Sequence, residues 1–265
     1  MSGLFLAGCA ARPPLVGAPS SLAEAVAGNY AQVETIVGTA SFRVRDGAES
    51  VRLGGALLFR RPDRLRVEVL TPLGQAVATF VYGRNQVRVH DHQAGRWFEG
   101  ESVDGMVELL GLAVPVEALL ETLRDGGMPV EPSLLALARD LPPGEDGGRR
   151  LELRDAGRVI EMQLDPRDPV VRARSIVVDG GVIEVARYDD FQGARGVQHP
   201  NRITVEWPGA DRGVEIRFRK KALNHSIDDE RFVLDPPPGV GWEPLERDLR
   251  GGGSRAGGLA GGGSR

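Results

Sequence analysis

Apolar and polar residues alternate through three parts of the chain, residues 40–82, 151–188 and 203–218. Between the apolar positions of the first part lie charged side chains such as Arg43 and Glu68. Successive side chains of a β-strand point to opposite faces of the sheet, so this period of two predicts strands with one apolar face and one solvated face. The turns between the strands are short, which favours an antiparallel meander.

Helical spacing precedes the first strands. Ser21 and Glu24 have the spacing of a capping box, in which two side chains satisfy free N–H groups at the start of a helix. Apolar residues then recur at helical intervals up to Gly38, at Val26, Tyr30, Val33 and Val37. This pattern predicts a first amphipathic helix.

The segment MVELLGLAVPVEALLETLRDGG, residues 106–127, interrupts the alternation. Its first part carries a short apolar stripe, and its second part has apolar residues at the i, i+3, i+4, i+7 positions between Pro115 and Gly126. We therefore expect two short helices here and a third from Pro132 to Arg139. The fold class that follows is mainly β (α+β), an unclosed and strongly curved antiparallel β-barrel of about ten to eleven strands with helices over its concave side.

The ends of the chain differ from this domain, which we place at residues 21–248. Residues 249–265 form a Gly/Ser-rich tail with little to bury, which predicts disorder. At the other end, the only cysteine, Cys9, follows the apolar run LFLAG, as in the lipobox of bacterial lipoproteins. Residues 1–8 are then interpreted as the remnant of a signal peptide, and residues 9–20 as a lipidated tether.

A lipid on Cys9 predicts attachment to the outer membrane at its periplasmic face, because residue 10 is Ala rather than the Asp that marks retention in the inner membrane. No other segment approaches the roughly 20 apolar residues that span a bilayer. We therefore expect attachment to the membrane through the lipid.

Composition argues against several classes of function. The 33 basic and 37 acidic residues give a net charge of −4 without a basic block, so nucleic acid is not an expected partner. Catalytic motifs of the Gly-x-Ser-x-Gly, phosphate-loop and His-Glu-x-x-His types are missing from the sequence. We expect a protein that is not an enzyme and uses no cofactor or metal.

The remaining polar residues have ordinary interpretations. His90 and His92 supply too few ligands for a metal site and are interpreted as a polar strand end facing solvent. The other two histidines and the Asp-Asp pairs at 189–190 and 228–229 are interpreted as turn residues. The pair Lys220-Lys221 is interpreted as the charged end of an edge strand.

Several of these segments, taken in order, resemble a known family. The lipobox, LFRRPDRLRVEVLTPLGQAVATF, MVELLGLAVPVEALLETLRDG and FVLDPPPGV together are similar to outer-membrane lipoprotein receptors of the LolB type and to their soluble partner, the LolA carrier. The similarity covers roughly residues 35–240. The chain departs from the family in a Gly-rich loop at Pro142 to Gly148 and in its C-terminal tail.

The resemblance implies a monomeric, unclosed barrel that accepts acylated lipoproteins from a LolA-like carrier, holds their acyl chains in an apolar cavity and releases them into the outer membrane. The lipobox favours the anchored receptor over the soluble carrier. A helical lid is implied at Met106, Leu109, Leu119 and Leu123. The residues that alternation places on the apolar side are candidates for the lining of the cavity: Phe42, Leu57, Phe59, Leu65, Val67, Val69, Phe80, Ile203, Val205, Ile216 and Phe218. Alternatively, the same side chains fill an ordinary core, and the protein is a structural or assembly lipoprotein of the envelope that binds protein partners.

The turn Thr71-Pro72-Leu73-Gly74 carries a leucine where a polar residue is usual. The LolB-type receptors carry an exposed leucine in a Pro-Leu-Gly context on a loop between two strands, and Leu73 matches that position. The resemblance therefore implies a membrane-insertion loop at Pro72, Leu73 and Gly74. Turn chemistry alone leaves open a second possibility, a leucine that folds back onto a neighbouring strand.

Overall fold

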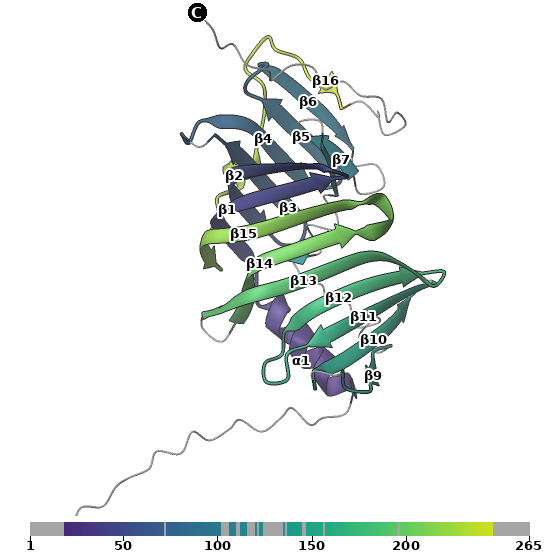
Figure 1. Ribbon diagram of the computed structural model, residues 1–265. Helices are drawn as coiled ribbons and strands as arrows, with labels where there is room; N and C mark the ends of the chain where they lie inside the picture. The colour runs from purple at the N-terminus through teal and green to yellow at the C-terminus, as the bar shows by residue number, and fades with distance from the viewer. Residues whose placement is uncertain are drawn as a thin grey trace, which may run out of the picture.

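The computed structural model contains a long, strongly curved β-sheet with the helix α1 packed against it (Figure 1). The structure describes residues 19–71, 73–101, 106–109, 112–115, 120, 122–123, 135, 137–144, 147–155, 157–194 and 197–245. The helix α1 spans Pro19–Ala31, and two short 3-10 helices are η1 (Pro208–Ala210) and η2 (Asp229–Phe232).

Fourteen strands form the main sheet. In chain order they are β1 (Thr35–Asp46), β2 (Glu49–Arg60), β3 (Arg64–Leu70), β4 (Ala76–Gly83), β5 (Gln86–Asp91), β6 (Arg96–Glu101), β9 (Arg139–Leu141), β10 (Arg149–Asp155), β11 (Arg158–Leu164), β12 (Val171–Val178), β13 (Gly181–Ala194), β14 (Val197–Trp207), β15 (Arg212–Leu223) and β16 (Glu243–Pro244). A separate two-stranded sheet consists of β7 (Met106–Leu109) and β8 (Leu112–Pro115).

The sheet is built from two antiparallel meanders, β1 to β6 and β9 to β15, which join where β1 pairs with β15. This junction brings together residues distant in the sequence, such as Ile36 opposite Leu223 and Asp46 opposite Arg212. The order of strands ends at β16 on one side and at β9 on the other. The sheet is therefore unclosed, as the sequence predicts.

One face of the sheet, here called the inner face, carries the hydrophobic core together with α1. The helix lies behind the lower half of the sheet in Figure 1, and its Leu22, Val26 and Tyr30 are buried. Asn29 holds the helix to β14, because its side chain donates to the carbonyl oxygen of Gln198 and accepts from the N–H of the same residue, both at 2.9 Å. The position of α1 is thus fixed by packing and by a paired hydrogen bond.

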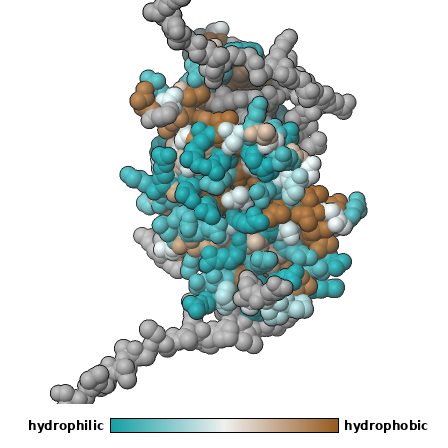
Figure 2. Space-filling view, in the orientation of Figure 1, coloured by the Kyte–Doolittle hydropathy of each residue, from teal (hydrophilic) through white to brown (hydrophobic). Residues whose placement is uncertain are grey.

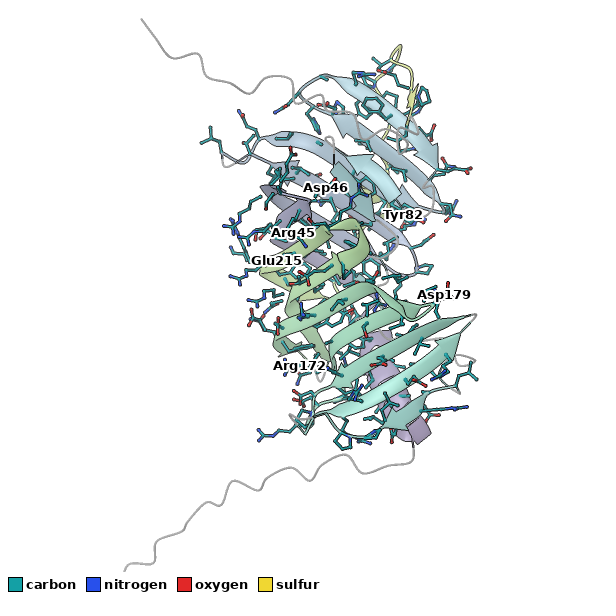
Figure 3. The ribbon with its side chains drawn as sticks, turned by 45° about the vertical axis from the view of Figure 1, so that its right-hand side comes forward. Arg45, Asp46, Tyr82, Arg172, Asp179 and Glu215 are labelled. Carbon is teal, nitrogen blue, oxygen red and sulfur yellow. The ribbon has the colours of Figure 1, made fainter. Side chains whose placement is uncertain are left out.

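The opposite, outer face is largely charged. Arg45, Arg172 and Glu215 project from it in Figure 3, and the space-filling view in Figure 2 shows a mainly hydrophilic surface. A hydrophobic patch interrupts that surface at the ends of the hairpins on the right of Figure 2, where Val182 and Ile183 are each 47% exposed. The alternation of the sequence has therefore sorted apolar and charged side chains onto the two faces.

Several predicted elements need correction. The first helix ends at Ala31 rather than near Gly38, because the β-branched run that begins at Thr35 enters β1. Residues 106–109 form β7 rather than a helix, since a short apolar run fits both periods and here pairs with β8. Arg139, expected at the end of a helix, begins β9.

The number of strands is also larger than the predicted ten to eleven. The three additional strands are β6, β9 and β16, because β5 is the strand whose end is predicted at His90 and His92. β9 and β16 are too short to show a period, and β6, with the sequence RWFEGE, lacks regular alternation. Their places in the sheet depend on pairing with neighbouring strands, which a local pattern does not encode.

Candidate functional site

All eleven residues predicted to line an apolar cavity lie on the inner face. The cross-strand pairs show this directly, because Phe42 lies opposite Ile216, which lies opposite Ile203. Within the meander of β1 to β6, Leu57 lies opposite Val67, which lies opposite Phe80. All of the predicted residues except Val69 therefore belong to or pack against one hydrophobic cluster, which crosses the junction of β1 and β15.

This surface is buried in the structure. Phe59, Ile203 and Val205 have no exposed area, and Phe42, the most exposed of the ten that are buried, is 9% exposed. Val67 is partly buried and packs against the same cluster, which also includes side chains of α1. Among the described residues, these side chains pack as a filled core.

The predicted lid residues separate into different elements. Met106 and Leu109 are in β7, so the helix expected there is wrong, and Leu119 lies outside the described residues. Leu123 is helical and 1% exposed, and nearby Leu120 is 5% exposed. Leu120 and Leu123 both belong to the core cluster, which places this helical segment on the inner face.

The turn between β3 and β4 presents Leu73 to solvent. Its side chain is 88% exposed, the largest value among the exposed large hydrophobic residues that the structure describes. The turn is held by the Gly74 N–H, which donates to the Thr71 carbonyl at 2.9 Å, and by the Thr71 N–H, which donates to the Gln75 carbonyl at 2.8 Å. Gly74 has a φ of +82°, a conformation that favours glycine. Pro72 lies outside the described residues.

Of the two possibilities for Leu73, the structure therefore has the exposed one. The leucine does not fold back onto a strand, and the hydrogen bonds of the turn hold it in this position. Such an isolated, exposed leucine has no packing role in the fold.

A buried polar cluster lies on the inner face near α1. His199 is fully buried in β14, and its Nδ1 atom lies 3.0 Å from the ammonium of Lys221. The ammonium also donates to the carbonyl oxygens of His199 and Pro200, at 3.1 and 2.8 Å. The His199 Nδ1 atom also lies 3.0 Å from the Pro200 carbonyl oxygen, and its Nε2 atom lies 3.5 Å from the Leu123 carbonyl oxygen.

The surroundings of these two groups favour their neutral forms. Burial, followed by the neighbouring Lys221, lowers the pKa of His199 to about 3. Burial lowers the pKa of Lys221 to about 7. The cluster links β14, β15 and the helical segment of Leu123.

Sequence reasoning misplaced both members of this cluster. His199, interpreted as a turn residue, is within β14, and Lys221, interpreted as the end of an edge strand, is in β15, which lies between β1 and β14. Simple alternation from Phe218 would place Lys221 on the outer face. A β-bulge, seen as a register shift between Thr39 and Ala40, turns Lys221 inward opposite Gly38.

A second charged pair is buried in the apolar wall. Arg174 of β12 and Glu184 of β13 form an ion pair, and their side chains are 4% and 8% exposed. The sequence carries a signal for this pair, because Arg174 is in phase with the buried Ile176 and Glu184 is in phase with the buried Ala186. A charged residue at an apolar position of a strand predicts an inward ion pair.

Two surface grooves lined by described residues lie away from the predicted lining. One, of about 420 Å³, lies on the outer face between β4, β5 and η2 and includes Arg88 and Phe232. The other, of about 360 Å³, lies at the ends of the hairpins and includes Val182, Ile183 and Trp207. Neither groove contains a residue of the predicted apolar cavity.

Two further observations bear on the class of site. No helix among the described residues is long and apolar enough to span a membrane. Within the same described residues, His, Cys, Asp and Glu side chains form no cluster of three or more suited to a metal ion. Cys9 and the tether lie outside the described residues.

Comparison with known proteins relates the chain to one family. Residues 36–221 match the family model Outer membrane lipoprotein LolB. A search of curated proteins finds no significant match. The structural relatives include a LolA superfamily protein from Nitrosomonas europaea, with 12% identity, a TM-score of 0.53, and coverage of 83% of this chain and 99% of the other.

A DUF1329 family protein from Desulfovibrio piger is also similar, with 11% identity, a TM-score of 0.58, and coverage of 82% of this chain and 98% of the other. Identities this low establish a shared fold and nothing finer. That fold is the unclosed, curved sheet with its inner apolar face.

Proposed function

Because the chain belongs to the LolB family of outer membrane lipoproteins, we propose that it binds the acyl chains of lipoproteins on its inner face and transfers them into the outer membrane. A lipid on Cys9 anchors the protein at the periplasmic face. Cargo arrives from a LolA-like carrier, and the transfer is non-covalent. The protein works as a monomer in this scheme.

The observation that carries the proposal is the continuous apolar inner face of an unclosed sheet. An acyl chain of about sixteen carbons exposes apolar surface in water at about 0.8 kcal/mol per methylene, or about 13 kcal/mol in total. Transfer between a carrier and a membrane therefore needs a shielded apolar site. The inner face offers one to a chain that enters from the open side of the sheet.

An acyl chain can bind to the filled inner face only if a segment that now packs on that face moves away. We assign this movement to the helical segment around Leu120 and Leu123, because it packs on the inner face without belonging to the sheet. Its described polar contact with β14 is the long one of 3.5 Å between the Leu123 carbonyl and His199. Outward movement of this segment would break that contact and open the apolar surface beneath it.

Photocrosslinking from matched neighbours tests the binding site. A benzophenone amino acid is placed at Phe42 or Phe218, both on the inner face, and separately at the adjacent exposed residues Arg43 and Arg217. A tritium-labelled triacylated lipopeptide is the probe. The proposal expects label at Phe42 and Phe218 and background at the two arginine positions.

The opposite distribution of crosslinked label would contradict the proposal. Label confined to Arg43 and Arg217, or equal label at all four positions, would mean that the inner face is a permanently filled core. The protein would then be a structural or assembly lipoprotein that acts through protein partners.

Delivery into the membrane is assigned to the Leu73 turn. The side chain is already exposed and needs no rearrangement to enter a bilayer. Burial of one leucine gives only about 1.5–3 kcal/mol, which is too little for an anchor but sufficient to favour a brief insertion. The turn therefore complements the lipid on Cys9.

A further inference from the structure

Four aromatic side chains form a cluster on the outer face of β5 and β6. The rings of His90 and Trp97 are stacked with centroids 3.7 Å apart and planes 10° apart. His92 lies 3.9 Å from His90, and Trp242 meets Trp97 edge-on at 6.0 Å. We call these four residues the aromatic patch.

Two distant parts of the chain build this patch. His90 and Trp97 are directly opposite each other in β5 and β6, so their side chains share the outer face. Trp242 comes from the C-terminal segment, which is fixed there by parallel pairing of β16 with β6 and by the ion pair between Arg96 and Glu243. The patch contains two of the three tryptophans of the chain.

The patch is adjacent to the Leu73 turn. His92 donates its backbone N–H to the Val77 carbonyl at 2.9 Å, and its Nε2 atom lies 2.9 Å from the hydroxyl of Thr79. Val77 is the second residue of β4, which begins directly after the turn, and β4 and β5 lie side by side in Figure 1. A strand rises by about 3.3 Å per residue, so the backbone contact of His92 is about 7 Å from Gln75, the last residue of the turn.

The rings of the patch remain accessible. His92 is exposed, and His90, Trp97 and Trp242 are half-buried. Burial, followed by the neighbouring His92, lowers the pKa of His90. The patch thus presents aromatic surface with polar N–H groups at its edges.

Two arginines beside the patch form ion pairs. Arg88 stacks over the Trp242 ring at 5.0 Å and also forms ion pairs with Glu99 and Asp235, at 2.8 and 2.9 Å. Arg96 is paired with Glu243. These two guanidinium groups offset two of the three carboxylates and so reduce the negative charge beside the rings.

This chemistry fits the polar layer of a bilayer. Tryptophan is enriched at membrane interfaces, because its ring is amphipathic and its N–H group needs a polar partner. We propose that the aromatic patch is a second membrane-contact element, which lies among the phospholipid headgroups of the bilayer while Leu73 enters the apolar layer beside it. The inference rests on the membrane delivery proposed above.

Vesicle binding of the full chain tests the proposal. The probe is vesicles of phosphatidylethanolamine and phosphatidylglycerol, and the variant carries Trp97→Ser together with Trp242→Ser. Loss of the contact of two rings should weaken partitioning into the vesicles by about tenfold. The matched control is Trp207→Ser, at the third tryptophan, which should partition like the parent.

Fluorescence quenching gives a second readout that leaves the patch intact. A Trp207→Phe variant emits from Trp97 and Trp242 alone, and vesicles with bromine atoms near the top of their acyl chains should quench this emission. The variant with Trp97→Phe and Trp242→Phe emits from Trp207 alone and should not be quenched. The comparison of these two phenylalanine variants does not depend on whether the serine variant folds.

Photocrosslinking of the lipopeptide at position 42, in place of Phe42, is measured in parallel. It distinguishes a failure of acyl binding from a failure of membrane contact by the aromatic patch. If the serine variant crosslinks normally and partitions like the parent, the patch has no membrane role, although acyl binding stands. A serine variant that exchanges cargo poorly with the carrier but binds vesicles normally would make the patch a protein-docking surface and overturn the inference.

Discussion

Gly55 lies on the inner face of β2, where the backbone of β3 and the ring of Phe42 come close. A Cβ atom built on Gly55 would lie 2.4 Å from the carbonyl oxygen of Glu68 and 3.1 Å from the Phe42 ring. The adjacent Gly54 has only one neighbour near its hypothetical Cβ, the Leu70 carbonyl oxygen at 3.9 Å. A single methyl group therefore has opposite consequences at two consecutive residues.

We expect Gly55→Ala to lower the free energy of unfolding by about 1–3 kcal/mol, because the backbone of β3 must move to accommodate the methyl group. Gly54→Ala is the matched control and should leave stability unchanged or raise it by about 0.5 kcal/mol, since alanine restricts the unfolded chain. Urea unfolding of both variants measures this. Equal effects would contradict the close approach at Gly55.

His199 makes the stability of the fold depend on pH. Its pKa is lowered to about 3 in the fold from an ordinary value of 6.5, so between these values the unfolded chain binds a proton that the fold excludes. Acidification from pH 6.5 therefore lowers the free energy of unfolding, by up to about 1.4 kcal/mol per pH unit from this one group.

We expect His199→Gln to remove this slope between pH 6.5 and pH 4.5, as measured by urea unfolding at a series of pH values. The amide oxygen of Gln can still accept from Lys221. The control is His225→Gln, a change at an exposed histidine, which should keep the slope of the parent. A slope that persists in His199→Gln would mean that another group is responsible.

At the scale of elements, the C-terminal segment covers part of the outer face. Arg66 donates to the carbonyl oxygens of Arg231 and Val233, at 3.1 and 3.3 Å, and the guanidinium of Arg60 lies 5.0 Å from the centre of the Phe232 ring. Phe232 of η2 is 8% exposed, whereas its neighbour Val233 is 52% exposed. Phe232 and the equally buried Leu234 thus hold this segment against a charged face.

We expect Phe232→Ala to lower the free energy of unfolding by about 3 kcal/mol, because it removes a buried ring. Val233→Ala, one residue away, should change it by less than about 0.5 kcal/mol. Denaturant unfolding compares the two. Similar small effects would show that the segment contributes little to stability.

The elements that local patterns predict best are those with long alternation. The strands around Phe42, Leu57 and Ile216 are predicted correctly, because each runs long enough for a period of two to be distinct. The segment at residues 106–109 was predicted as a helix and is β7, since four apolar-rich residues fit either period. Trp242 could not be assigned a role from the sequence, because its neighbours come from β5 and β6.

At the scale of the whole molecule, an unclosed sheet places an apolar inner face and an exposed leucine in one rigid body. The inner face provides the proposed binding site for acyl chains, and the Leu73 turn provides the proposed contact with the bilayer. The proposed acyl binding and the proposed contact with the bilayer therefore depend on different residues, and each can be tested by its own variants.

We expect Leu73→Glu to leave stability and lipopeptide binding unchanged while slowing transfer into liposomes by about tenfold or more, because the turn can no longer enter the bilayer. The matched control is Leu137→Glu, at a leucine that is 50% exposed beside β9 at the far edge of the sheet. Transfer by Leu73→Glu at the rate of the parent would reduce Leu73 to an ordinary turn residue.

The sequence by itself determined which face of each long strand is apolar, where the chain turns, and that Leu73 stands at a turn. These properties follow from the geometry of the backbone, which sends alternate side chains to opposite faces whatever the strand pairs with. Only the tertiary structure decided that β1 pairs with β15, that a bulge turns Lys221 toward His199, and that Trp242 joins Trp97 beside the Leu73 turn. Contacts of this kind join residues far apart in the chain, and their free energy depends on the packing of the whole sheet rather than on any local pattern.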